Sequence, residues 1–251
     1  MKTEKNGFTL VELLVVIGIL GILMGALFPA ISAAMIKANL SACSMRGRNL
    51  YVAITSSNVE REAAGLSSIW PRSGKAAEST GGEKDISETG YTSAYQYFND
   101  LFDVGNMSNT DEWSPYVQGI DLGCLSGAGV QPVKSGQDLK AENVGWCIGA
   151  NVQDEIEDIV PVLVTRNVDC SSLRKKYEGG NEKLQWSENY STPFAKKAFV
   201  MISKGGGAVA MTQKYLTTAV IYKKQTFELP EATDDIGEFL YLGPDSAQNP
   251  Q

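Results

Sequence analysis

The hydrophobic pattern sets the first part of the chain apart from the rest. From Leu13 to Ile36 no residue is charged, and the stretch begins LLVVIGILGILMGALFPAI. Twenty-four helical residues at about 1.5 Å each span about 36 Å, enough to cross the hydrocarbon core of a bilayer. Because lipid offers the backbone no hydrogen-bond partners, a segment that resides there must be helical. The pattern therefore predicts a membrane-spanning helix.

Beyond this run, apolar or small residues recur at alternating steps of four and three, the spacing of one helical face. They are Ile36, Leu40, Cys43, Gly47, Leu50 and Ile54. We therefore expect one long helix, membrane-spanning over 8–36 and amphipathic over 37–58, whose stripe packs on a globular domain. Gly47 either weakens this helix or lets a strand approach it closely.

The remaining residues, 59–251, read as one domain of mixed structure. Thr92 or Ser93 is placed to cap a short helix with the apolar face Tyr95, Phe98, Leu101 and Phe102. A Gly-rich turn joins two strands within 199–211. Strands are expected at Val144–Gly149, Ile159–Thr165, Ala198–Ser203, Ala208–Thr212 and Thr218–Tyr222. A helix followed by hairpin strands predicts an α+β fold with an antiparallel sheet.

The composition excludes several classes of function. The 251 residues carry a net charge of −7 and include no histidine. That excludes Ser-His-Asp and Cys-His catalysis and His-ligated zinc. The acidic balance argues against a nucleic-acid partner, because phosphate attraction needs clustered Lys and Arg. With no phosphate-binding loop and no G-x-S-x-G nucleophile motif, we expect no enzymatic activity.

The residues just before the apolar run have a specific arrangement. They read KNGFTLVE from Lys5 to Glu12: a basic leader, Gly7, Phe8, and a Glu four residues after the Phe. This resembles the processing signal of type IV prepilins and type II secretion pseudopilins. The resemblance implies a leader of residues 1–7, which prepilin peptidase removes between Gly7 and Phe8 before it methylates the new amine. The alternative is an ordinary signal peptide, whose apolar region is usually only about 7–15 residues.

Two residues in the predicted helix have roles that the resemblance implies. A carboxylate at Glu12 costs around 2.5–3.5 kcal/mol at mid-membrane and less near the interface. The resemblance implies that it pairs with the Phe8 amine of a neighbouring subunit, which favours correct register. The alternative is a boundary carboxylate that reaches the headgroups. Pro29 removes a backbone hydrogen bond and is expected to kink or loosen the helix; the resemblance implies unwinding nearby during assembly.

The sequence leaves undecided which of three cysteines in the soluble domain form a disulfide. Outside the cytoplasmic membrane, an oxidising compartment permits at least one bridge among Cys124, Cys147 and Cys170, with the pairing undetermined. Cys43 lies on the helical stripe and reads as a buried thiol.

A calcium site is the second open question. Calcium takes about six to eight oxygen ligands, and major pseudopilins often bind it in a C-terminal loop. In the C-terminal part of this chain the candidate ligands are Asp234, Asp235, Glu238 and Asp245. Their spacing matches no EF-hand, so a solvated acidic surface is the alternative. No other cofactor is expected.

These observations together favour a structural subunit of a type II secretion pseudopilus. The resemblance implies a single-pass protein of the bacterial inner membrane, with its domain in the periplasm and a filament as its assembled state. The implied partners are prepilin peptidase, other pilin or pseudopilin subunits including its own copies, and the inner-membrane assembly platform. A type IV pilus subunit for adhesion, motility or DNA uptake is the alternative. A membrane-anchored extracytoplasmic binding module is a third; it would keep Lys2 and Lys5 and would not need Glu12.

Overall fold

The computed structural model describes residues 9–74, 85–103, 116–117, 119–133, 139–173, 175–212, 216–233 and 235–248. The chain divides into two compact units, with the boundary between Ala38 and Asn39. This boundary lies within the long first helix, so each unit contains part of it.

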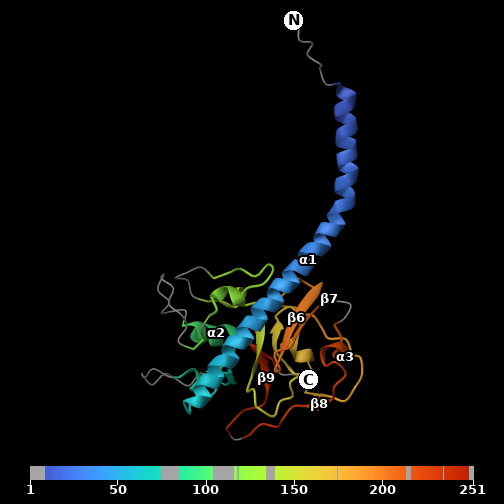
Figure 1. The fold of residues 1–251 in the computed structure, drawn as a ribbon. Helices are drawn as coiled ribbons and strands as arrows, with labels where there is room; N and C mark the ends of the chain where they lie inside the picture. The colour runs from blue at the N-terminus through green and yellow to red at the C-terminus, as the bar shows by residue number, and fades with distance from the viewer. Residues whose placement is uncertain are drawn as a thin grey trace. The chain divides into compact units, whose positions relative to one another are not determined.

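The first helix, α1, runs from Leu10 to Ala63 and is drawn from dark blue to cyan in Figure 1. One long helix is confirmed, but it ends five residues later than expected. Its end is set by Gly65, whose φ of 73° favours glycine. The Gly65 N–H donates to Glu62 O (3.0 Å) and the Leu66 N–H to Arg61 O (2.9 Å). This is a Schellman motif, which satisfies carbonyls of the last turn.

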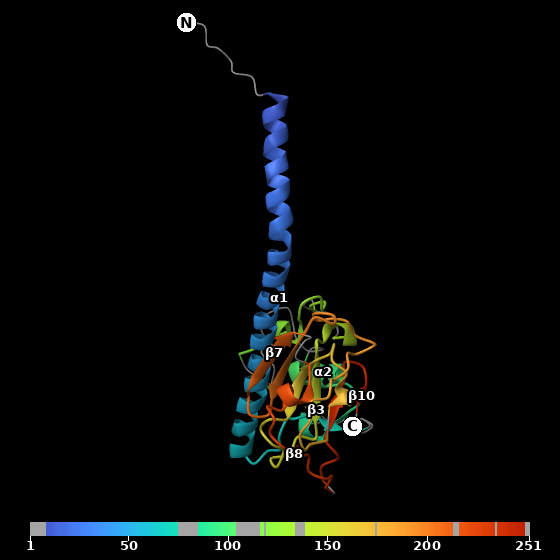
Figure 2. The same cartoon turned by 90° about the vertical axis from the view of Figure 1, so that its right-hand side faces the viewer.

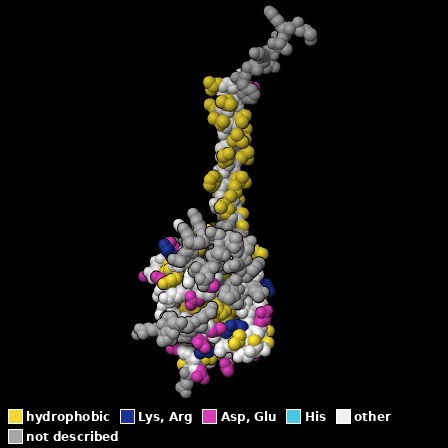
Figure 3. Space-filling view, turned by 90° about the vertical axis from the view of Figure 1, so that its left-hand side faces the viewer, with side chains coloured by type: hydrophobic (Ala, Val, Ile, Leu, Met, Phe, Trp, Pro, Cys, Tyr) yellow, Lys and Arg dark blue, Asp and Glu magenta, His cyan; other side chains and the backbone are white. Residues whose placement is uncertain are grey.

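The first unit consists, as far as it is described, of the first part of α1. Every described residue over 9–35 is exposed, and Figure 3 shows apolar side chains along the visible face of this part of the helix. Pro29 lies within α1, and the helix continues through it. By length and composition α1 can cross a membrane.

The second unit contains a six-stranded sheet in the order β10-β9-β3-β4-β6-β7. All neighbouring strands are antiparallel, which confirms the expected α+β layout. In chain order the strands are β3 (Trp146–Ala150), β4 (Pro161–Thr165), β6 (Ala198–Ser203), β7 (Ala208–Thr212), β9 (Leu240–Leu242) and β10 (Ala247–Gln248). The predicted hairpin is β6–β7, in which Phe199 pairs with Met211.

Within this unit the second part of α1 packs beside the sheet (Figures 1 and 2). The predicted stripe is confirmed from Leu40 onward, whereas Ile36 stays partly exposed. The buried residues of α1 are Leu40, Cys43, Gly47, Leu50, Ala53 and Ile54. The helix therefore contributes one face to the core of the domain.

The short helix α2 (Ala94–Phe102) forms where it was expected, with Ser93 at its N-cap position. The Ser93 side chain makes no capping bond there. The backbone N–H groups of Ala94 and Tyr95 instead donate to carbonyls of Gly243 and Pro244. Tertiary structure thus supplies the cap that the serine was expected to provide.

One strand prediction was wrong. The segment Thr218–Tyr222 contains the one-turn helix α3, Thr218–Ile221, and no strand. Its β-branched residues suggested a strand, but β propensity depends strongly on context. In a helix Thr218, Ile221 and Tyr222 share one face, and all three are buried. Burial of that face explains the helical outcome.

Short elements complete the described domain. Two small sheets pair β1 with β2 in parallel and β5 with β8 antiparallel. These strands and the 3₁₀ turns are β1 (Arg72–Ser73), η1 (Ile86–Glu88), β2 (Gly90–Tyr91), η2 (Leu122–Leu125), η3 (Ala141–Asn143), η4 (Cys170–Ser172), β5 (Lys176–Tyr177) and β8 (Phe227–Glu228).

Candidate functional site

The start of α1 is closed by a reciprocal contact between Thr9 and Glu12. The backbone N–H of Thr9 and its hydroxyl both donate to Glu12 Oε2, at 2.8 Å and 2.7 Å. The backbone N–H of Glu12 donates to Thr9 Oγ1 at 3.3 Å. This is a capping box, in which the N-cap residue and the third helical residue satisfy each other's backbone donors. The Glu12 carboxylate is thereby held at the beginning of its own helix.

The role of Thr9 was missed in the sequence, although its signal was present. A Thr three residues before a Glu, just ahead of an apolar run, is the sequence pattern of a capping box. Both bonds from Thr9 end on one carboxylate oxygen. A carboxylate has about four lone-pair sites, so Glu12 keeps acceptor capacity for a further donor. Gly7 and Phe8, the predicted processing residues, lie outside the described residues.

The surroundings of Glu12 are apolar. Its neighbours Leu10, Val11 and Leu13 are 79%, 69% and 58% exposed. Among the described residues of the first unit no apolar side chain is buried. A continuous apolar surface of this extent requires a lipid or protein environment. The arrangement can therefore anchor the chain in a membrane or join it to similar helices.

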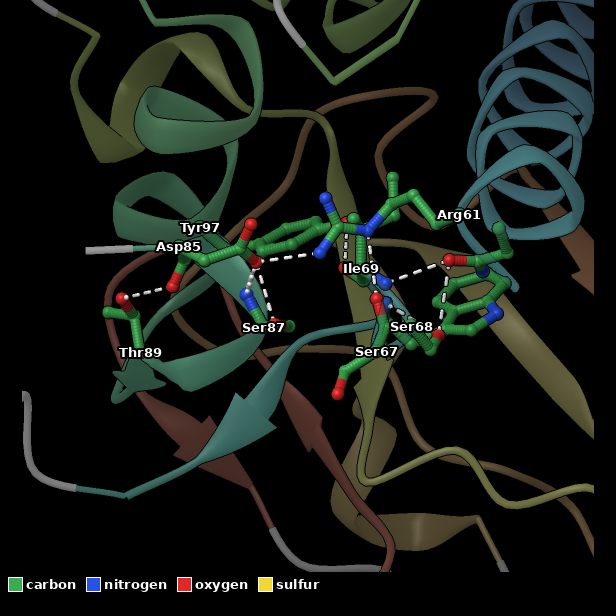
Figure 4. Close-up of polar contacts among 10 residues, drawn as sticks. Arg61, Ser67, Ser68, Ile69, Asp85, Ser87, Thr89 and Tyr97 are labelled. Carbon is green, nitrogen blue, oxygen red and sulfur yellow. Dashed lines mark hydrogen bonds and ion pairs between the residues drawn. The ribbon is translucent and has the colours of Figure 1, made fainter. Parts of the chain in front are cut away.

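At its other end, α1 is fastened to the domain by a polar network (Figure 4). Arg61 donates to the Asp85 carboxylate and to Ser67 O, each at 2.8 Å. Asn58 Oδ1 accepts from the backbone N–H of Ile69 at 2.7 Å, and the Tyr97 hydroxyl donates to Ile69 O at 3.0 Å. The helix, the loop that follows it and α2 are thus joined by hydrogen bonds and an ion pair.

Asp85 is the charged centre of this network. Burial raises the pKa of its carboxyl, but hydrogen bonds from Ser87 and Arg61 favour the ionised form and leave that pKa below its ordinary value. Asp85 also caps η1 by accepting from the Ser87 N–H. The Asp85 carboxylate therefore binds one partner on α1, Arg61, and one on η1, Ser87.

Within the described part of the chain, the proposed calcium ligands are not grouped into a metal site. Glu238 forms an ion pair with Lys175, and the pKa of Tyr190 is raised to about 12, first by burial and then by the neighbouring Asp245 carboxylate. In the described part of the chain no three acidic, histidine or cysteine side chains are grouped to hold a metal. Asp234 lies outside that part, so calcium binding stays a prediction.

All four cysteines are buried free thiols. Cys43 lies on the packed face of α1, and burial raises its pKa to about 12. Cys147 and Cys170 share one hydrophobic cluster, and their side chains lie within interaction range of each other. The structure thus brings together one pair among the three residues for which a disulfide was predicted.

Comparison with known families concerns the N-terminal segment. Residues 2–28 match the family model described as the prokaryotic N-terminal methylation motif. This motif is the signature of prepilin-type precursors of type IV pilins and pseudopilins, and it confirms the predicted resemblance. It supports a pilin-like or pseudopilin precursor without distinguishing the two systems. No curated protein and no solved structure matches the chain.

Proposed function

We propose that this chain, whose first residues carry the signature of prepilin-type precursors, is a structural subunit of a type II secretion pseudopilus. One observation carries the proposal: the motif over 2–28 continues into a helix whose described residues are exposed over 9–35. A helix with apolar side chains on every face is suited to lipid before assembly and to a bundle of like helices afterwards. The subunit would support protein export and act without catalysis of its own.

Processing gives the proposed subunit its working form. Prepilin peptidase would cut between Gly7 and Phe8 and methylate the Phe8 amine, with the apolar helix remaining on the mature chain. The helix would hold the subunit in the inner membrane as a single span, with the domain on the periplasmic side. The inner-membrane assembly platform would then pass it to the growing filament.

Assembly needs a preference that the hydrophobic effect alone does not supply. Lipid tails are as apolar as leucine, so moving a helix from lipid into a bundle gains little hydrophobic free energy. A charge pair buried among the helices changes this balance, because an unpaired charge in hydrocarbon is costly. Glu12, positioned by Thr9, would accept the Phe8 amine of the neighbouring subunit and so select the register.

Deletion of the gene in its native bacterium tests the assignment. We expect folded proteins to be retained in the periplasm while surface pili and motility are unchanged, with export restored by the wild-type gene. Normal export together with lost pili or DNA uptake would identify a type IV pilus subunit instead. If neither export nor pili change while binding of the cells to glycan or protein is lost, a membrane-anchored binding module replaces both.

A further inference from the structure

Cys147 and Cys170 lie side by side in the core of the domain. Cys147 is the second residue of β3, and Cys170 is the first residue of η4, which follows β4. Their exposed fractions are 1% and 0%. Each side chain lies within interaction range of the other, and both belong to the buried cluster that contains Tyr241 and Phe199. The two sulfurs are therefore neighbours although 22 residues separate them in the chain.

Their proximity is fixed by the sheet and by the turn that follows β4. In the register of β3 and β4, Cys147 pairs with Val164. At the end of β4, Arg166 donates through its backbone N–H to Gly145 O (3.0 Å) and through its guanidinium to Val144 O (2.8 Å). The chain just after β4 is thus tied to the residues that lead into β3.

The turn that carries Cys170 is itself held in place. Asp169 accepts from the Ser171 N–H at 3.0 Å and so caps η4. The backbone N–H of Asp169 donates to Gln185 O at 3.0 Å, and Cys170 Sγ contacts Val168 O at 3.8 Å. The thiol of Cys170 is consequently directed into the core by a hydrogen-bonded frame, which leaves it beside Cys147.

We propose that Cys147 and Cys170 are joined by a disulfide in the exported protein. The proposal rests on the proposed function, which places the domain in the oxidising compartment outside the inner membrane. The oxidant would be the disulfide of a thiol–disulfide oxidoreductase. Cys147 and Cys170 each lose a proton, and together they give two electrons to form the S–S bond; the oxidoreductase disulfide is reduced to two thiols.

The burial of the pair determines when the bond forms. Exchange requires a thiolate that can reach the oxidant, whereas both sulfurs are enclosed in the folded domain. Burial also raises the pKa of Cys170 well above its ordinary value, which disfavours the thiolate there. The bond therefore forms during folding, before β3 and η4 close over it. Once formed, it is shielded from reductants.

Trypsin separates the two cysteines, because Lys140, Arg166 and Arg174 place them in peptides 141–166 and 167–174. Full-length protein from native membranes is denatured with N-ethylmaleimide and digested without reductant, and the peptides are measured by mass spectrometry. We expect linked peptides in about tenfold or greater excess over the alkylated ones, and loss of the linkage on reduction. Cys170→Ser should abolish the linked species, and Cys124→Ser should retain it.

A second arm separates this pairing from the proposed function. The full chain is refolded in detergent and a glutathione redox buffer, then digested in the same way. If the refolded chain leaves both peptides alkylated, the pairing is overturned wherever the protein resides. A chain that begins at Phe8 yet is unlinked in its native membrane overturns it as well. A native chain that keeps Met1 and free thiols, while the refolded chain links, supports the pairing and overturns the proposed function.

Discussion

Gly47 of α1 lies directly against the indole of Trp146 on β3. A Cβ built on Gly47 would be 2.5 Å from Trp146 Cη2 and 2.9 Å from Cζ2. Trp146 is only 1% exposed, and its Nε1 donates to Cys124 O at 3.0 Å. The ring has neither free space nor a free polar atom, so it cannot move aside easily. Because Gly47 has no Cβ, α1 and β3 can approach each other this closely.

We expect Gly47→Ala to lower the free energy of unfolding by about 1–3 kcal/mol, as overpacked cores usually do. This loss should appear although alanine raises helix propensity by roughly 1 kcal/mol. Denaturant unfolding of the full chain in detergent, followed by tryptophan fluorescence, measures it. Ser41→Ala, at an exposed position of α1, is the control. A Gly47→Ala protein as stable as wild type would show that the contact is not tight.

The double substitution tests the contact itself. In the Gly47→Ala background, Trp146→Phe creates room for the new methyl group, so it should cost less than in the wild-type background. A coupling energy of about 0.5–3 kcal/mol between the two positions is expected for residues in contact. Additive effects would mean that the alanine acts through the helix alone.

Thr9→Val should reduce filament yield several-fold relative to the amount of processed subunit. The change keeps the shape of the side chain but removes the hydroxyl that binds the Glu12 carboxylate, and an N-cap contributes about 1 kcal/mol. Thr9→Ser keeps the hydroxyl and should assemble like wild type. Immunoblots for cleavage and quantitative electron microscopy of sheared filaments give the two readouts. If Val and Ser variants assemble equally, Thr9 does not position Glu12.

Substitutions at Glu12 separate its charge from its capping bond. Glu12→Gln retains an oxygen that accepts from Thr9 but has no charge, whereas Glu12→Ala loses both. We expect both to be processed and both to assemble at least about tenfold less, since hydrogen bonds to charged groups contribute about 1.5–3 kcal/mol. Normal filament yield from Glu12→Gln would assign the residue a capping role only, and normal yield from Glu12→Ala would remove it from assembly.

The stabilising contribution of Asp85 should be lost in acid, so the domain should become less stable at low pH. Its folded-state pKa lies below the ordinary value, so its contribution is complete above the unfolded pKa near about 4. That contribution is lost as the pH falls through the unfolded value toward the folded one. Asp85→Asn should lower stability by roughly 1 kcal/mol at neutral pH and flatten the acid slope.

Urea unfolding of the wild type and Asp85→Asn between about pH 7 and pH 3 gives the comparison. Glu88→Gln is the matched control, because Glu88 is an exposed carboxylate on the same element, η1. An acid slope that is unchanged in Asp85→Asn would place the responsible carboxylates elsewhere.

Local patterns in the sequence predicted most of the helical structure. The steps from Leu40 to Ile54 defined the buried face of α1, because helical periodicity is a property of the chain alone. Gly65 also marks the end of α1 in the sequence. The strand predicted at Thr218–Tyr222 was wrong because burial of one helical face overrode the strand propensity of these residues.

Relationships between distant segments could not be predicted in this way. Strand β9 lies beside β3 although it follows β7 in the chain, and no local pattern specifies that insertion. The pairing of β3 with β4 and the turn that follows β4 bring Cys147 and Cys170 together, so the sequence supplied three cysteines but not their pairing. In the N-terminal segment, by contrast, Thr9 and Glu12 are three residues apart, and their contact follows from spacing.

N-terminal mass spectrometry of the mature protein from its native membrane tests the central claim most directly. A subunit of the proposed kind begins at Phe8 with a methylated amine and keeps the apolar helix over 8–36. A chain that begins at Met1 or Lys2, or one that begins beyond Ile36 because the helix has been removed, would contradict it.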